Sequence, residues 1–90
     1  MTPVQPRVAV VVPLPGQRLH VQFADGIAGE VDCKSLIDGE QAGVFAALRN
    51  PIEFDRVGVE HGAVTWACGL DLAPDAMYDE VRQNGRWVLR

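Results

Sequence analysis

Four residues of this chain belong to the types that bind soft metals: His20, Cys33, His61 and Cys68. A structural zinc site needs four convergent ligands, usually supplied by closely spaced pairs. The two cysteines here are 35 residues apart, and no two of the four residues are close in sequence. We therefore expect no metal and no other cofactor, and we interpret the four as two surface histidines and two partly buried thiols.

The two cysteines are also poorly placed for nucleophilic catalysis, which requires a thiolate in electropositive surroundings. Cys33 has Lys34 on one side, but Asp32 is adjacent on the other side and Glu30 is three residues away. Cys68 lies at the end of an expected strand. Because neighbouring acids raise the pKa of a thiol, cysteine-dependent hydrolysis is disfavoured.

Two pairs of carboxylates have spacings that acid–base catalysis could use. Glu30 and Asp32 share one face of an expected strand, and Asp75 and Asp79 are one helical turn apart. Such catalysis needs one carboxyl group in an apolar pocket with a raised pKa, whereas a solvated face explains both pairs more simply. No glycine pattern typical of a phosphate-binding loop is present. The sequence predicts a protein that is not an enzyme.

The densest group of informative residues is Trp66, Asp71, Pro74 and Tyr78. In one interpretation Trp66 caps the small core, and Asp71 accepts backbone N–H bonds in the loop before the last helix. In the other, an edge formed by Trp66 and Tyr78 binds a partner, because aromatic side chains dominate interface energies. The second interpretation makes Trp66, Asp71 and Tyr78 candidate partner-binding residues, and the sequence leaves the choice open.

The C-terminal tail, residues 84–90, supplies two more candidates. Adjacent apolar residues run from Trp87 to Leu89, between Arg86 and Arg90. Exposed termini are usually polar, so we expect this segment to be buried as an extended strand. It either returns to the chain's own sheet or adds to an edge of a second copy or a partner. We favour the intermolecular contact, a homodimer included, with Trp87 and Leu89 as partner-binding residues.

Composition and charge limit the class of protein. Ninety residues with 48% hydrophobic content correspond to a single domain, residues 1–90. The net charge is −4, yet residues 25–80 carry all 12 acidic side chains and only three basic ones. Such an acidic body disfavours direct nucleic-acid binding; it suits a basic protein partner or is simply a soluble surface. With no membrane-length apolar run, no signal-peptide core and two cysteines, we expect a cytoplasmic protein.

Hydrophobic patterning predicts the elements that position these residues. After a loose arm over residues 1–6, strands are expected over residues 7–12, 18–23 and 27–32. Pro15 and Gly16 fit the centre of a type II turn. Asp25 and Gly26 fit a tight hairpin in which Gly26 has a positive φ. The first third of the chain is therefore an antiparallel meander.

The second half mixes helices and strands. One helical turn is expected at Ser35–Asp38, and a short helix over residues 40–49 is expected to bury Val44, Phe45 and Leu48 until Asn50-Pro51 ends it. Strands follow over residues 54–60 and 63–67, joined by His61-Gly62, and a last helix begins at Pro74 and ends before Gly85. The order βββ-α-ββ-α predicts an α+β fold, with a small antiparallel sheet and two short helices.

Two sequence patterns carry a family resemblance: L-x-V-x-F-x-D-G from Leu19 to Gly26, and V-x-W-x-x-G-x-D-L-x-P-D-x-x-Y from Val64 to Tyr78. In this order and spacing, together with Phe45, they resemble a small prokaryotic family, the domain of unknown function 2442. The resemblance covers nearly the whole chain. It implies a compact α+β fold like that of the N-terminal domain of a Nitrosomonas structural-genomics protein.

The resemblance also implies a class of function. Some members of the family carry a helix-turn-helix domain after this module, and this sequence shows none. Others are encoded beside a second small protein and look like partners in toxin–antitoxin-type modules. We therefore predict a non-catalytic protein–protein interaction module, antitoxin-like or regulatory, within a two-gene module. The alternative is a stand-alone small-molecule-sensing accessory domain of a transcription regulator family, which requires an apolar pocket with convergent polar groups.

Overall fold

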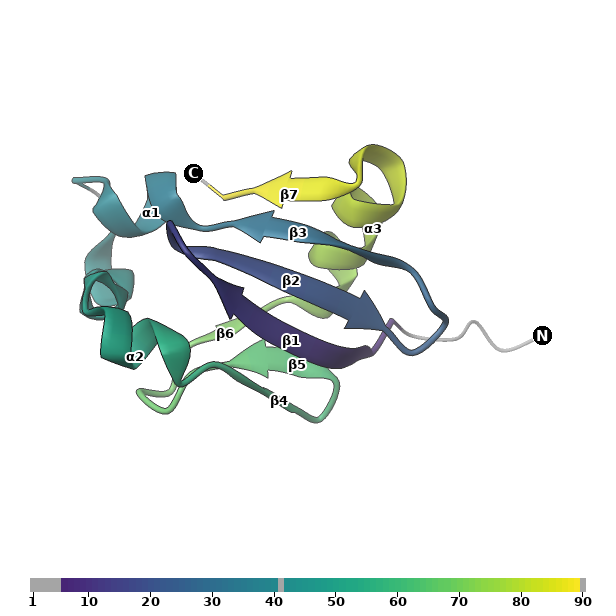
Figure 1. Cartoon of the computed structure of the whole chain (residues 1–90), viewed down its shortest axis with the longest axis horizontal. Coiled ribbons are helices and arrows are strands. Elements are labelled where there is room, and N and C mark those ends of the chain that lie inside the picture. Colours follow the sequence, from purple (N-terminus) through teal and green to yellow (C-terminus); the bar gives the residue numbers. More distant parts are fainter. Residues whose placement is uncertain (1–5, 41, 90) are drawn as a thin grey trace.

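The computed structural model describes residues 6–40 and 42–89. The expected arm over residues 1–6 lies outside this range except for Pro6. The strands are β1 (Val8–Leu14), β2 (Arg18–Phe23), β3 (Ala28–Asp32), β4 (Gly58–Glu60), β5 (Ala63–Thr65), β6 (Asp71–Leu72) and β7 (Arg86–Val88). The helices are α1 (Lys34–Asp38), a 3₁₀ helix η1 (Gly43–Arg49), α2 (Pro51–Asp55) and α3 (Pro74–Asn84). The predicted α+β class is confirmed (Figure 1).

The N-terminal meander forms as predicted. β1 pairs with β2 and β2 with β3, both antiparallel, and a bulge lies between Val8 and Val10. Leu19, Val21 and Phe23 on β2 are buried, because the strict alternation of the strand turns them all to one face. Gly26 has a φ of 94°, so the predicted tight turn is confirmed.

The region between β3 and β4 differs from the prediction. The predicted continuous helix over residues 40–49 is wrong, because Gly43 has a φ of 57° and the segment Gly43–Arg49 is a 3₁₀ helix. Val44, predicted to be buried, is 70% exposed, whereas Leu48 is in the core. A 3₁₀ helix has three residues per turn, so Val44 and Leu48 do not share a face as they would in an α-helix.

Pro51 follows the end of η1, as predicted, and is also the first residue of a further helix, α2. Asn50 caps α2, since its side-chain Oδ1 accepts a hydrogen bond from the backbone N of Ile52 at 3.0 Å. Proline is favourable in the first helical turn, where its missing N–H would have no partner. The strand predicted over residues 54–60 is therefore correct only for its last part, because β4 begins at Gly58. Phe54 is instead a buried residue of α2.

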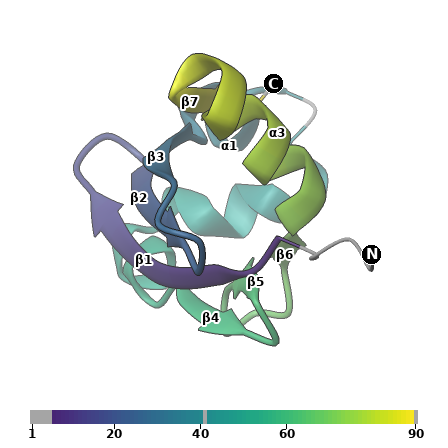
Figure 2. The same cartoon turned by 90° about the vertical axis from the view of Figure 1, so that its right-hand side faces the viewer.

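The strands form two small sheets. One has the order β1-β2-β3-β7 and the other the order β4-β5-β6. All pairs are antiparallel except β3 and β7, which run parallel. The chain between these two strands contains all four described helices, the last of which, α3, leads into β7 and packs against both strands. The second sheet lies beside β1, the edge strand of the first sheet, and the N–H of Val8 donates to the carbonyl of Gly62 at 2.9 Å. Figure 2 shows both sheets and α3 surrounding the interior.

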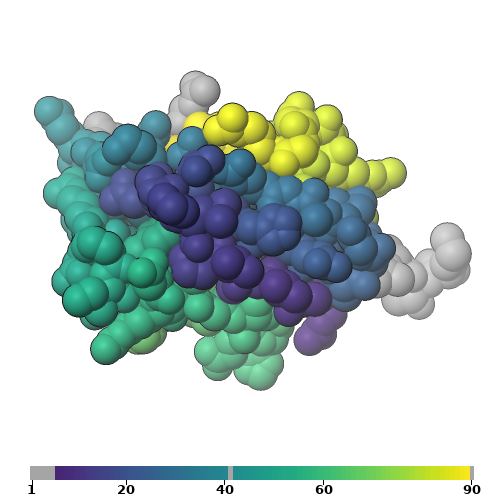
Figure 3. Space-filling model, in the orientation of Figure 1, coloured from purple at the N-terminus to yellow at the C-terminus, as the bar shows by residue number. Residues whose placement is uncertain are grey.

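The interior holds one hydrophobic cluster, to which both sheets and all four described helices contribute. Its members are Val8, Leu19, Val21, Phe23, Val31, Cys33, Ile37, Leu48, Phe54, Val64, Trp66, Leu72, Met77 and Val81. The last helix contributes Met77 and Val81, and it ends at Gly85 in a left-handed conformation, as predicted. The other face of the four-stranded sheet is the molecular surface, with no helix over β1, β2 or β3 (Figure 3).

The C-terminal tail is part of the chain's own sheet. β7 pairs with β3 through residues 86–88, and the N–H of Leu89 donates to the carbonyl of Asp32 at 2.9 Å. Trp87 and Leu89 are half-buried against the core. The tail therefore follows the intramolecular alternative and not the intermolecular contact that the sequence favours. Parallel pairing needs a long connection, so the local sequence of the tail did not reveal it. Self-association through the outer edge of β7 stays a prediction.

Candidate functional site

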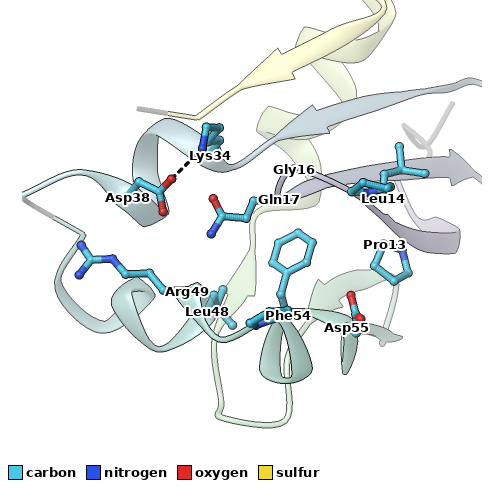
Figure 4. Close-up of a pocket in the computed structure, with 12 residues that line it drawn as sticks. Pro13, Leu14, Gly16, Gln17, Lys34, Asp38, Leu48, Arg49, Phe54 and Asp55 are labelled. Carbon is cyan, nitrogen blue, oxygen red and sulfur yellow. Dashed lines mark hydrogen bonds and ion pairs between the residues drawn. The ribbon is translucent and has the colours of Figure 1, made fainter.

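A hollow of about 530 Å³ lies where the β1–β2 turn meets the short helices (Figure 4). We call it the turn-end hollow. Its lining comes from four places along the chain: the end of β1 and the turn, α1, η1 and α2. The lining residues are Pro13, Leu14, Pro15, Gly16, Gln17, Lys34, Asp38, Leu48, Arg49, Pro51, Phe54 and Asp55.

The apolar part of this lining belongs partly to the core and partly to the surface. Leu48 and Phe54 are buried members of the hydrophobic cluster. Pro13 and Leu14 are half-buried at the end of β1. The hollow thus has an apolar floor fixed by the core and walls open to solvent.

Two cations at the hollow are held by neighbouring groups. Arg49 donates from Nε to the carbonyl of Ile37 at 2.7 Å and from Nη2 to the carbonyl of Gly39 at 2.9 Å. Lys34 Nζ donates to Asp38 Oδ2 at 3.0 Å. This bond is the main cause that lowers the pKa of Asp38.

Gln17 is the most unusual residue of the hollow. It follows Pro15-Gly16 in the turn and has a φ of 60°, a backbone angle that residues other than glycine rarely adopt. The N–H of Cys33 donates to the carbonyl of Gln17 at 3.0 Å and holds this conformation. The side-chain Oε1 is buried, and no described residue donates a hydrogen bond to it. Figure 4 shows Gln17 between the Lys34–Asp38 pair and the ring of Phe54.

The arrangement is suited to binding. The nearby Cys33 thiol is buried, and burial followed by the charge of Asp32 raises its pKa to about 12. A thiol in this state is a poor nucleophile. A buried polar atom without a hydrogen bond and a residue in the left-handed conformation each lower the stability of the fold. Features of this kind are found most often at functional sites, including binding sites.

Trp66 and Asp71 do not line the turn-end hollow. Trp66 is 3% exposed, donates from Nε1 to the carbonyl of Phe54 at 3.0 Å, and packs against the Phe54 ring at 5.9 Å. Asp71 is exposed on β6, and its carboxylate takes part in no side-chain hydrogen bond with a described residue. Trp66 thus occupies a core position, whereas the expected role of Asp71 in the loop is not observed.

Tyr78 forms a different cluster from Trp66. Its ring packs edge-on against Phe23 with centroids 5.0 Å apart, and its hydroxyl donates to Asp25 Oδ2 at 2.6 Å. The proposed Trp66–Tyr78 edge is therefore divided between two aromatic pairs. Trp87 and Leu89 belong to β7 and the residue after it. A partner-binding role for Trp66, Asp71, Tyr78, Trp87 and Leu89 stays a prediction.

The other candidate groups lie on the surface or in ion pairs. His20, His61 and Cys68 are exposed and Cys33 is buried, and among residues 6–40 and 42–89 no cluster of three potential metal ligands exists. Glu30 Oε1 is 2.7 Å from Arg18 Nη1, and Asp32 Oδ2 is 3.1 Å from Arg86 Nη2. Asp75 and Asp79 are exposed on α3.

Sequence reasoning did not identify Gln17. The signal available is a long polar side chain directly after Pro15-Gly16, the pair that predicts the turn. The sequence also gave no indication that Lys34, Asp38 and Arg49 meet at this turn. Their meeting depends on the short helices, of which only the single turn at Ser35–Asp38 was predicted close to its true place.

Comparison with known families agrees with the resemblance seen in the sequence. The model of a family described as a protein of unknown function, DUF2442, matches residues 8–83. No curated protein and no solved structure matches the chain. Among the helices described, none is long and apolar enough to cross a membrane. The matched range begins with β1 and reaches the last turn of α3, so it contains every residue of the turn-end hollow, and residues 84–90 with β7 lie beyond it. The chain therefore belongs to the DUF2442 family.

Proposed function

We propose that this protein is a non-catalytic protein–protein interaction module that binds a segment of its partner in the turn-end hollow. The observation that carries the proposal is the buried Oε1 of Gln17, which has no donor among the described residues. An unsatisfied buried acceptor costs roughly 1–3 kcal/mol. A segment that brings an N–H group into the hollow gives this oxygen a donor once the amide turns toward it.

The surroundings of the hollow favour a protein segment. Val44 on η1 is 70% exposed and Ile52 on α2 is 67% exposed, and both elements line the hollow. Exposed apolar side chains beside a concave site are typical of surfaces that bind proteins. An apolar side chain of the partner fits the floor formed by Leu48 and Phe54.

Charge supports a partner segment with a basic residue. Asp38 and Asp55 both line the hollow. The guanidinium of Arg49 is already held by two backbone carbonyls. Lys34 is paired with Asp38 through a single bond that is exposed to solvent. A lysine or arginine of the partner can therefore meet a carboxylate and also donate to Gln17.

The wider role that we propose is that of an antitoxin-like or regulatory partner in a two-gene module in the cytoplasm. It rests on the family resemblance rather than on the geometry of the hollow. The partner that we expect is the second small protein encoded beside this chain.

Co-expression with the protein encoded next to this chain tests the proposal. We expect a stoichiometric complex on size exclusion, which Leu14→Asp abolishes because a charge enters the apolar wall. Val10→Asp is the matched control, since Val10 lies in the same strand, is 44% exposed and does not line the hollow. Retention of the complex in Leu14→Asp, or loss of it in both folded variants, would place the contact elsewhere.

The second candidate function, small-molecule sensing, is favoured by the size of the hollow. Its volume of about 530 Å³ falls in the range of roughly 300–1,000 Å³ that small ligands occupy. A metabolite that raises the melting temperature of the native chain and not of Leu14→Asp would favour this function over a protein partner.

A further inference from the structure

A second hollow, of about 390 Å³, lies at the opposite end of the β1–β2 hairpin. We call it the open-end hollow, because it lies beside the first residues of β1 and the last residue of β2. It is lined by Pro6, Arg7, Phe23, Ala24, Asp25, Tyr78 and Arg82. None of these residues lines the turn-end hollow.

The aromatic part of the open-end hollow is rigid. Phe23 is 1% exposed, and the Tyr78 ring packs against it edge-on. The Tyr78 hydroxyl donates to Asp25 Oδ2 at 2.6 Å, and the N–H of Ile27 donates to Asp25 Oδ1 at 3.0 Å. Both oxygens of this carboxylate are therefore engaged by donors of the chain itself.

The two arginines of this hollow have no ion-pair partner among the described residues. A Cβ atom placed on Gly62 would lie 3.1 Å from Arg7 Cβ and 3.3 Å from Arg7 Nε, so the Arg7 side chain rests directly on the backbone of this glycine. Arg82 projects from the last turn of α3. Among the described residues, neither arginine forms an ion pair or a side-chain hydrogen bond.

We propose that the open-end hollow binds a carboxylate attached to an apolar group, with Arg7 and Arg82 holding the carboxylate and the Phe23–Tyr78 pair contacting the apolar group. The lining residue of this hollow that carries a carboxylate is Asp25, and it already accepts hydrogen bonds from Tyr78 and Ile27. Arginine is well suited to this role because its donors match a carboxylate with two parallel hydrogen bonds. The ligand is either a free aryl or alkyl carboxylic acid or the C-terminus of a peptide that ends in an apolar residue.

The test uses 3-phenylpropanoate as the free acid and a short acetylated peptide ending in phenylalanine as the chain end. Each is added to the full chain and followed by NMR chemical shifts, and 3-phenylpropanamide and the C-terminally amidated peptide serve as neutral controls. We expect the acids to shift the Tyr78 ring signals, and the neutral controls to bind at least about tenfold more weakly, because they lose charge-assisted hydrogen bonds.

Variants assign the binding to the two arginines. Arg7→Gln and Arg82→Gln are each expected to raise the Kd by about tenfold. Arg56→Gln, a matched change of an exposed arginine outside this hollow, is expected to leave the Kd unchanged. Tighter binding of the peptide acid than of 3-phenylpropanoate identifies a protein chain end as the ligand, and equal binding identifies a small acid.

Three results would overturn the proposal: no shift up to about 10 mM of either acid, equal binding of acids and neutral controls, or unchanged binding in both arginine variants. The Leu14→Asp variant separates this site from the proposed function. Acid binding that persists in Leu14→Asp shows that the open-end hollow works independently of any partner at the turn-end hollow.

Discussion

The two ends of the β1–β2 hairpin make opposite electrostatic demands on a ligand. At the turn-end hollow, Lys34 and Arg49 are engaged by Asp38 and by backbone carbonyls, while the Gln17 oxygen has no described donor. At the open-end hollow, Asp25 is engaged, while the arginines have no described acceptor. One hairpin therefore presents an acceptor at one end and donors at the other.

The difference follows from what each end of the hairpin contacts. Short helices surround the turn, and their last carbonyls need donors that the helices themselves do not supply. Arg49 satisfies two such carbonyls, of Ile37 and Gly39. At the other end, α3 brings Tyr78 to Asp25 and places Arg82 in its last turn, where a cation interacts favourably with the helix dipole.

The largest expected effects test whether both ends share one core. Phe54 lies under the turn-end hollow and Phe23 under the open-end hollow, and both are buried. Phe54→Ala and Phe23→Ala should each lower the free energy of unfolding by about 3–5 kcal/mol, because each leaves a cavity in the same cluster. Urea denaturation measures this, and a small loss for only one of them would show that its end is not part of the core.

The turn at the open end should depend on its backbone conformation. Gly26 has a φ of 94°, and nothing lies within 4 Å of a Cβ placed there, so a side chain meets backbone strain alone. Gly26→Val should lower the free energy of unfolding by roughly 1–3 kcal/mol. Gly58→Val is the matched control: Gly58 has open space too, but its φ is not positive. Equal melting temperatures for the two variants would contradict the assigned turn.

At the turn end, removing the Gln17 side chain should stabilise the protein. Gln17→Gly relieves the left-handed strain and removes the unsatisfied oxygen, so the free energy of unfolding should rise by about 1 kcal/mol. The same change at Gln22, an exposed residue of β2, should lower it by about 0.5–1 kcal/mol. If Gln17→Gly binds the partner like the native chain, Gln17 has no part in the site.

The smallest effects concern the carboxylates, one at each end. Hydrogen bonds to Tyr78 and then to Ile27 lower the pKa of Asp25, and the bond to Lys34 lowers the pKa of Asp38. A depressed folded-state pKa contributes stability above the unfolded-state pKa, so this contribution should disappear as the pH falls below about 4. Tyr78→Phe should raise the pKa of Asp25 alone, and Lys34→Gln that of Asp38 alone, as measured by NMR titration. A parallel change of both would show that the ends are coupled.

The hairpins were predictable because their signals are local. Alternation from Arg18 to Phe23 and the Asp25-Gly26 turn involve residues adjacent in sequence, and no distant contact competes with them. The same holds for α3, with Pro74 at its start and Gly85 after its end. The candidate site was less predictable. Tyr78 was identified, but its partner is Asp25, 53 residues away.

Sequence alone determined the α+β class, the meander, the last helix and the family, because each depends on periodicity and turn residues that a short window contains. Tertiary structure alone decided the parallel pairing of β7 with β3, the division into two sheets and the 3₁₀ conformation of Gly43–Arg49. It also decided which polar groups found partners. The physical reason is that the conformational preference of a short segment is weak. Where burying an apolar residue such as Leu48 or Trp87 stabilises the fold by more than this preference, the segment adopts the conformation that buries the residue.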